Sequence, residues 1–216
     1  MLSRGEQQAR RSMVKEQIAR RGISDRRVLD AMGSVPRENF IPEEQLHLAY
    51  ADQPLPIGLG QTISQPYIVA LMAERARLTR QSKVLEIGTG SGYAAAVFAK
   101  IADHVWTVER LRELAEGAEQ RFQDLKIDNI TTVVDDGASG YPASAPFDAI
   151  IVAAAAPSAP KPLLDQLAVG GHLVIPVGDR SFQDLSVFER TSHGYDERSA
   201  GSCRFVPLIS PEAFRG

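Results

Sequence analysis

Short apolar runs that alternate with helical patterns constrain the fold of this chain more than any other feature. The alternation begins after Arg80. The predicted strands are Lys83–Ile87, Val105–Glu109, Ile130–Val134, Phe147–Val152 and His172–Val177, and the predicted helices between them are Tyr93–Ile101, Arg112–Leu125 and Lys161–Leu167. Strands that alternate with helices predict a parallel sheet with right-handed crossovers and helices on both faces.

Two further strands are predicted near the end of the sequence, at Leu185–Arg190 and Cys203–Leu208. The linker between them, TSHGYDERSAGS, is polar and rich in turn formers. Late strands joined in this way suggest an antiparallel addition at one edge of the sheet. We therefore expect an α/β fold with a doubly wound, mostly parallel sheet and an antiparallel C-terminal edge.

The first 80 residues show a different sequence pattern, without the alternation of strands and helices. The stretch up to Val35 has helical spacing, and Asp25 is placed to cap a second short helix. Prolines and glycines then break regular structure from Pro36 to Pro66, where a new helix opens. A loop this long within a compact domain is more often functional than idle. We expect residues 1–80 to form a helical cap with an active-site loop and residues 81–216 to form the core, as one compact unit.

Composition narrows the possible partners and compartments. The formal net charge of −3 gives no long-range attraction to nucleic acid or anionic membranes. Charges occupy the positions near Met1 where a signal peptide needs apolar residues, and the apolar run Ala149–Ala156 is far shorter than the ~20 residues of a membrane span. The lone Cys203 and the scattered histidines show no metal-ligand spacing. We expect a cytoplasmic monomer without a metal, nucleic-acid or membrane partner.

A glycine-rich turn follows the first predicted strand, in VLEIGTGSGYAAAVFA. Gly88, Gly90 and Gly92 permit a tight turn and close approach of a ligand, and the helix from Tyr93 presents free N–H groups. Such a turn can also do no more than connect a strand to a helix. Its spacing, G-x-G-x-G, differs from the G-x-G-x-x-G fingerprint that binds a dinucleotide.

Acidic residues stand at the ends of the neighbouring strands. Glu109 ends the second strand, where a carboxylate can accept hydrogen bonds from both hydroxyls of a ribose. Glu86 is polar within an apolar strand, and we expect it to organise the turn or to hold a ligand's ammonium group. Asp136 could accept the exocyclic amine of adenine, and Gly137 would let the base lie close, although Asp-Gly is also a common turn without a ligand. Together, the glycine spacing and these residues at the strand ends favour S-adenosyl-L-methionine (AdoMet) over NAD as the ligand.

Nearly the whole sequence, from about Met13 to Leu208, resembles the protein-L-isoaspartate O-methyltransferase family. The shared blocks, in order, are VPRENFIPEE, ADQPLPIGLGQTISQPYIVALM, VLEIGTGSGYAAAVFA, DDGASGYPASAPFDAIIVAAAAP, LAVGGHLVIPVG and RFVPL. The resemblance implies a Rossmann-like class I AdoMet methyltransferase with a seven-stranded sheet. It also implies an enzyme that esterifies the α-carboxylate of L-isoaspartyl residues in damaged proteins and peptides.

The resemblance assigns roles to particular residues. Ser64 in QTISQP would be the active-site serine, and Thr62, Ser64 and Val206 would contact the substrate. The cofactor would be held by Glu86, Gly88, Gly90, Gly92, Glu109, Asp136 and Gly137. Two residues depart from the family pattern: Asp135 replaces a small residue before Asp-Gly, and Cys203 replaces an aliphatic residue before RFVPL.

The chemistry implied by the resemblance needs no general base, because the accepting carboxylate is already ionised at neutral pH. Alignment and exclusion of water are then the enzyme's task, and Ser64 would aim the carboxylate by a hydrogen bond. From the residues alone, Ser64 could instead cap the helix that opens at Pro66.

Other functions stay open at this point. An aspartyl O-methyltransferase acting on a modified peptide would share this core, and so would a non-catalytic AdoMet-binding protein. A dehydrogenase is disfavoured by the glycine spacing, and a serine hydrolase by the absence of a G-x-S-x-G elbow.

Overall fold

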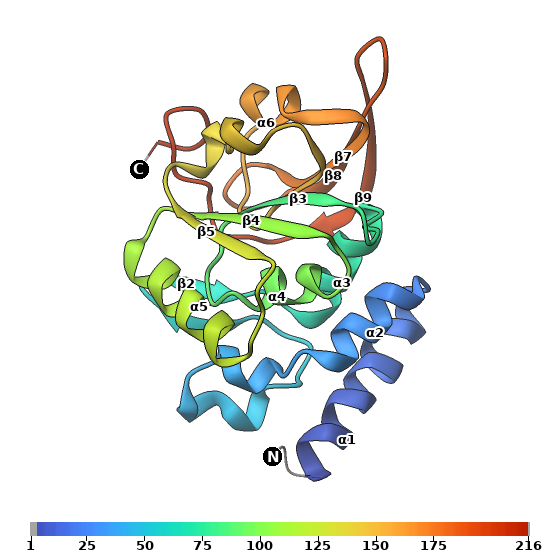
Figure 1. The fold of residues 1–216 in the computed structure, drawn as a ribbon, viewed down its shortest axis with the longest axis vertical. Helices are drawn as coiled ribbons and strands as arrows, with labels where there is room; N and C mark the ends of the chain where they lie inside the picture. Colours follow the sequence, from blue (N-terminus) through green and yellow to red (C-terminus); the bar gives the residue numbers. More distant parts are fainter. Residues whose placement is uncertain (1–3, 216) are drawn as a thin grey trace.

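A computed structural model describes residues 4–215 and shows an α/β fold built on one large sheet (Figure 1). Within these residues the seven-stranded sheet has the order β5-β4-β3-β6-β7-β8-β9, and β1 and β2 form a separate two-stranded sheet. The strands are β1 Leu55–Gly58, β2 Gln61–Ile63, β3 Lys83–Ile87, β4 His104–Glu109, β5 Ile130–Val134, β6 Phe147–Val152, β7 Leu167–Gly178, β8 Gln183–Arg190 and β9 Tyr195–Cys203. The doubly wound, mostly parallel sheet is confirmed.

The interior strand β3 shows why the buried part of the fold could be predicted from the sequence. β3 pairs in parallel with β4 on one side and with β6 on the other. Its alternate residues belong to hydrophobic clusters on opposite faces, Val84 to one cluster and Leu85 and Ile87 to the other. A strand covered on both faces is apolar at successive positions, which is the pattern its sequence shows.

Helices cover both faces of the sheet. α3 (Pro66–Arg75), α4 (Tyr93–Ala99) and α5 (Arg112–Asp124) lie below it in Figure 1, and α6 (Lys161–Asp165) lies above it. The N-terminal segment packs on the lower layer, away from the sheet. It contains α1 (Arg4–Ser12), a π-helical turn Met13–Ile18, a 3-10 turn Ala19–Arg21 and α2 (Arg26–Ser34).

The predicted cap of α2 is confirmed, because the Asp25 side chain accepts a hydrogen bond from the Arg27 N–H at 2.9 Å. The segment expected to be one loop from Pro36 to Pro66 holds more structure than its sequence indicates. It contains 3-10 helices at Arg37–Phe40 and Glu43–Leu48, followed by the β1–β2 hairpin.

The predicted strand Cys203–Leu208 is wrong. The last strand is β9, which pairs antiparallel with β8 through a hairpin whose turn spans residues 191–194. Most β9 side chains are exposed at the edge of the sheet, so the strand needs no apolar pattern and its polar sequence resembles a linker. The expected antiparallel edge is therefore present, but β8 and β9 form it, and β9 begins eight residues before the predicted strand.

The segment after β9 runs back across the carboxyl ends of the parallel strands, and we call residues 204–215 the C-terminal crossing segment. The Ala155 N–H donates to the Val206 carbonyl at 2.8 Å, and the Leu208 N–H donates to the Ala155 carbonyl at 2.7 Å. Farther along, the Ser210 hydroxyl donates to Asp136 beyond the end of β5, at 2.6 Å. The crossing segment thereby closes one side of the functional region.

Candidate functional site

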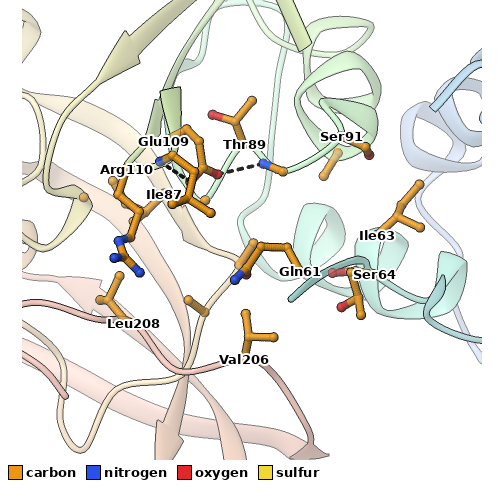
Figure 2. A pocket seen from close by; sticks show the side chains of 18 of the residues that line it. Gln61, Ile63, Ser64, Ile87, Thr89, Ser91, Glu109, Arg110, Val206 and Leu208 are labelled. Carbon is orange, nitrogen blue, oxygen red and sulfur yellow. Dashed lines mark hydrogen bonds between the residues drawn. The ribbon is translucent and has the colours of Figure 1, made fainter. Parts of the chain in front are cut away.

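A cavity of about 300 Å³, which we call the central pocket, opens at the carboxyl ends of β3, β4 and β6 (Figure 2). Ligands of open α/β sheets bind at this position. Its walls come from the β1–β2 hairpin, the turns after β3, β4 and β6, and the C-terminal crossing segment. Of the predicted site residues, the pocket wall includes Thr62, Ser64, Gly88, Gly90, Glu109, Gly137 and Val206.

The turn after β3 brings backbone directly to the pocket. Gly88 and Gly90 have φ angles of 91° and 53°, in the left-handed region that side chains disfavour. A Cβ at Gly90 would also lie 3.4 Å from Ile57 of the β1–β2 hairpin. Bare glycines therefore let the hairpin and a ligand approach the same turn.

Gly92 has another purpose in this structure. It is not among the described residues that line the central pocket. A Cβ there would lie 2.8 Å from the Phe122 ring and 3.1 Å from Ala118 on α5. Its small size is required by the packing of the turn against α5, so the expectation of a cofactor contact at Gly92 gains no support.

Glu109 reaches the pocket from the end of β4 and is only 6% exposed. One carboxylate oxygen accepts from the Gly90 N–H and the other from the Leu111 N–H, each at 3.0 Å. Figure 2 shows the first of these bonds across the top of the pocket. Each oxygen keeps a further lone pair, so Glu109 can hold the glycine turn and also accept hydrogen bonds from a diol.

Glu86 lies behind the pocket wall and is fully buried. Thr107 donates to its carboxylate at 2.5 Å, and the Thr107 and Thr89 hydroxyls are 2.6 Å apart. Its other oxygen has no hydrogen-bond partner among the described residues, and burial raises the pKa of Glu86 to about 8. Since Thr89 lines the pocket and Glu86 does not, the structure favours the turn-organising role over direct contact with an ammonium group.

Asp136 lines a neighbouring cavity, the C-terminal pocket, which shares Arg110 and Ile209 with the central pocket. One Asp136 oxygen accepts from the Ala138 N–H at 3.0 Å and the other from the Ser210 hydroxyl at 2.6 Å. Asp136 therefore fastens the C-terminal crossing segment to the sheet, and any bond to an adenine amine would share an oxygen with one of these donors.

Gly137 lines the central pocket itself. A Cβ there would lie 2.3 Å from the Ile87 side chain, so this position tolerates only glycine without local movement. The unusual Asp135 turns back on the chain, accepting from the Asp136 N–H at 2.7 Å, and it lines the C-terminal pocket.

Ser64 stands where two cavities meet. It lines the central pocket and also a second, more open cavity, the side pocket, and Thr62, Ala153, Val206 and Pro207 line both as well. In Figure 2, Ser64 and Glu109 lie at opposite ends of the central pocket. A small molecule bound against Glu109 and a larger molecule in the side pocket would thus meet beside the Ser64 hydroxyl.

The capping alternative for Ser64 is wrong, because Gln65 is the N-cap of α3 and no side-chain capping bond comes from either residue. The helix end is held instead by Asp52. Its carboxylate accepts from the Tyr67 N–H at 3.0 Å, the Gln65 amide at 2.7 Å and the Arg21 guanidinium at 2.5 Å. The Ser64 hydroxyl is therefore not used to cap the helix and can bind a ligand in either pocket.

Sequence reasoning missed several residues of the site. Gln61, Arg110 and Ile209 line the central pocket. Arg110 had a usable signal, because it directly follows Glu109 at the end of a strand. Gln61 and Ile209 lie on segments that meet the glycine turn only through the fold.

Residues 4–215 contain no cluster of three or more His, Cys, Asp or Glu side chains suited to a metal ion. No helix in this range is both long enough and apolar enough to cross a membrane.

Comparison with known proteins gives a consistent result. Residues 8–213 match the family model for protein-L-isoaspartate(D-aspartate) O-methyltransferase. A protein-L-isoaspartate O-methyltransferase 2 of Pelobacter propionicus is 52% identical over 213 residues, which cover 98% of this chain and 95% of the relative. A protein-L-isoaspartate O-methyltransferase of Picosynechococcus is 55% identical over 199 residues, covering 92% and 89%.

Solved structures agree. A protein-L-isoaspartate O-methyltransferase superposes with a TM-score of 0.85 at 28% identity, over 94% of this chain and 67% of the other. A Plasmodium falciparum β-aspartate methyltransferase in complex with S-adenosyl-L-homocysteine superposes with a TM-score of 0.80 at 30% identity, over 93% and 98%.

Proposed function

The chain belongs to the protein-L-isoaspartate(D-aspartate) O-methyltransferase family, and from this premise we propose how its site works. The enzyme transfers a methyl group from AdoMet to the α-carboxylate of L-isoaspartyl residues in damaged proteins and peptides. The observation that carries the proposal is the position of Ser64, on the wall shared by the central and side pockets. A cofactor and a peptide bound in the two cavities would meet there.

The described residues of the central pocket fit AdoMet. The glycine turn exposes backbone to the cavity without side chains, Glu109 offers acceptors suited to the ribose hydroxyls, and Gly137 presents bare backbone to the cavity, against which a base could lie. When bound, AdoMet supplies a methyl group on a sulfonium, which is already electrophilic.

Ser64 orients the accepting carboxylate. The isoaspartyl α-carboxylate is ionised at neutral pH, so no base has to remove a proton from it. The Ser64 hydroxyl donates to one carboxylate oxygen and leaves the other directed toward the central pocket, so that positioning lowers the barrier. Ser64 forms no covalent intermediate.

Val206 holds the peptide by its backbone. Its carbonyl already accepts from the Ala155 N–H at 2.8 Å, whereas its own N–H has no partner among the described residues. The Val206 N–H is therefore the group that remains for a carbonyl of the substrate. This narrows the expected contact between Val206 and the substrate to a single backbone donor.

The product ester needs no further enzymatic step. Methanol leaves more readily than hydroxide, so the neighbouring backbone nitrogen of the substrate closes to a succinimide, and hydrolysis returns some normal aspartate. The partners are thus damaged proteins and peptides. We also place the enzyme in the cytoplasm as a monomer without nucleic-acid or membrane partners; its net charge of −3 gives no long-range attraction to nucleic acid or anionic membranes.

Methyl transfer to paired synthetic peptides tests the proposal. The two peptides differ only in Asp versus isoAsp, and labelled AdoMet reports the transfer. We expect transfer to the isoAsp peptide alone. Ser64→Ala should lower single-turnover transfer about ten- to a thousandfold while AdoMet binding stays near wild type. Ser12→Ala, at the exposed end of α1, is the control. Equal labelling of both peptides, or a fully active Ser64→Ala protein, would contradict the proposal.

A further inference from the structure

The charged side chains that line the side pocket are all positive. Its lining includes Arg21, Arg180 and Arg204, and no aspartate or glutamate is among the described residues that line it. The chain as a whole has a formal net charge of −3. The positive charge is therefore a local property of the cavity that adjoins Ser64.

Within residues 4–215, one of the three guanidinium groups has a carboxylate partner. Arg21 pairs with Asp52 at 2.5 Å and lies 3.5 Å over the Tyr67 ring. Arg180 donates to the Arg215 carbonyl at 3.0 Å and has no carboxylate partner among the described residues. Arg204 is exposed and has neither a hydrogen bond nor an ion pair within residues 4–215.

The turn that carries Arg180 is held in place before any ligand arrives. Asp179 accepts from the Ser181 N–H at 2.6 Å and from the Phe182 N–H at 2.8 Å. The Arg180 guanidinium also lies 5.5 Å from the centre of the Phe214 ring. A cation held in this way loses less conformational freedom when it binds an anion than a freely moving one does.

We propose that the side pocket selects isoaspartyl peptides with acidic residues beside the damaged position, and that Arg180 and Arg204 determine this preference. The inference rests on the proposed function, which puts the peptide in this cavity. Guanidinium groups pair with carboxylates in a two-pronged geometry that a solvated lysine does not match. Basic flanking residues would bring like charges together and be disfavoured.

Three peptides test the preference. All carry one isoAsp in the same frame, with flanking Glu, Gln or Lys residues. Exposed ion pairs are individually weak, so we expect kcat/KM to be about 3- to 20-fold higher for the Glu than for the Lys peptide in 20 mM salt. The difference should lie mainly in KM and shrink toward unity in 1 M salt, where screening is nearly complete.

Substitutions assign the effect to the side pocket. Arg180→Gln and Arg204→Gln should each reduce the Glu-to-Lys ratio, and the double variant should bring it close to one. The matched control is Arg26→Gln, which removes the same charge from an 89% exposed side chain on α2 and should keep the wild-type ratio. A thermal melt of each variant verifies folding, and the salt dependence of the wild type needs no variant.

The outcomes separate the two proposals. Absence of transfer to all three peptides would overturn the proposed function. Transfer to all three with equal kcat/KM would overturn only the charge preference. The charge preference would also be overturned if Arg26→Gln lowered the Glu-to-Lys ratio as much as the side-pocket variants do. The effect would then come from the overall charge of the protein.

Discussion

Asp52 joins the helix end after Ser64 to the N-terminal segment, so its replacement gives a sharp test of how Ser64 is positioned. Asp52→Ala removes the bonds to the Tyr67 N–H, the Gln65 amide and the Arg21 guanidinium together. These donors flank or face the turn that carries Ser64. We expect the variant to lose both stability and turnover.

The size of the stability loss follows from each contact. A carboxylate that caps a helix N-terminus contributes about 1 kcal/mol. The Asp52 side chain is 18% exposed and Arg21 is 45% exposed, so screening limits their ion pair to at most about 1 kcal/mol. With the Gln65 bond, the total is about 2–3 kcal/mol. At about 2–4 °C per kcal/mol for a chain of this length, Tm should fall by about 5–10 °C.

Turnover should fall as well, because Ser64 would sample positions that do not orient the carboxylate. We expect a loss of about 5- to 50-fold in kcat, with AdoMet affinity changed less than twofold. The assay is single-turnover transfer to an isoaspartyl peptide at least 20 °C below the Tm of the variant. Asp52→Asn keeps an acceptor for the Tyr67 N–H and should retain most of the activity. An Asp52→Ala protein that melts earlier but turns over normally would refute the positioning argument.

Further outcomes follow from the pocket. Glu109→Ala should weaken AdoMet binding by about 1.5–3 kcal/mol, more than it slows saturated turnover, and calorimetry measures this; unchanged affinity would remove Glu109 as the ribose acceptor. Gly137→Ala should destabilise the fold by about 1–3 kcal/mol in denaturant unfolding, since its Cβ meets Ile87 at 2.3 Å, and Ile87→Ala in the same chain should restore part of the loss. The unfolded chain releases the Glu86 proton near pH 4.5 and the folded chain near pH 8, so stability falls as pH rises across that window. Glu86→Gln should therefore raise Tm more at pH 8 than at pH 5, and an equal change at both would contradict a protonated Glu86.

The buried part of the fold could be predicted because its sequence pattern and its environment agree. Central strands such as β3 are apolar at successive positions, since helices cover both of their faces. The edge strand β9 and the short β1–β2 hairpin lack that pattern. β9 is mostly exposed, and the hairpin lies in a segment whose prolines and glycines indicate a loop. Cys203–Leu208 resembles a strand in sequence because all of its residues except Arg204 are apolar, yet from Arg204 onward these residues form no strand and line the pockets.

The residues of the candidate site also fall into those that the sequence pattern could predict and those that it could not. Residues at the ends of strands, such as Glu109 and Gly88, were found because the chain order of a doubly wound sheet brings them to one edge. Gly92 follows the same local pattern but serves packing. Asp52 was missed because its partner Tyr67 lies 15 positions farther along the chain. No periodicity connects a loop carboxylate to the end of a later helix.

The C-terminal crossing segment also governs when the site can exist during synthesis. Val206 and Ile209 line the same pocket as Gln61, although most of the chain separates them. A nascent chain that has exposed the glycine turn but still holds Val206 inside the ribosome has a central pocket that lacks one wall. Domains generally fold as units as they emerge. If AdoMet binds in this pocket as proposed, we expect tight cofactor binding to follow emergence of the crossing segment and not to guide folding of the emerging core.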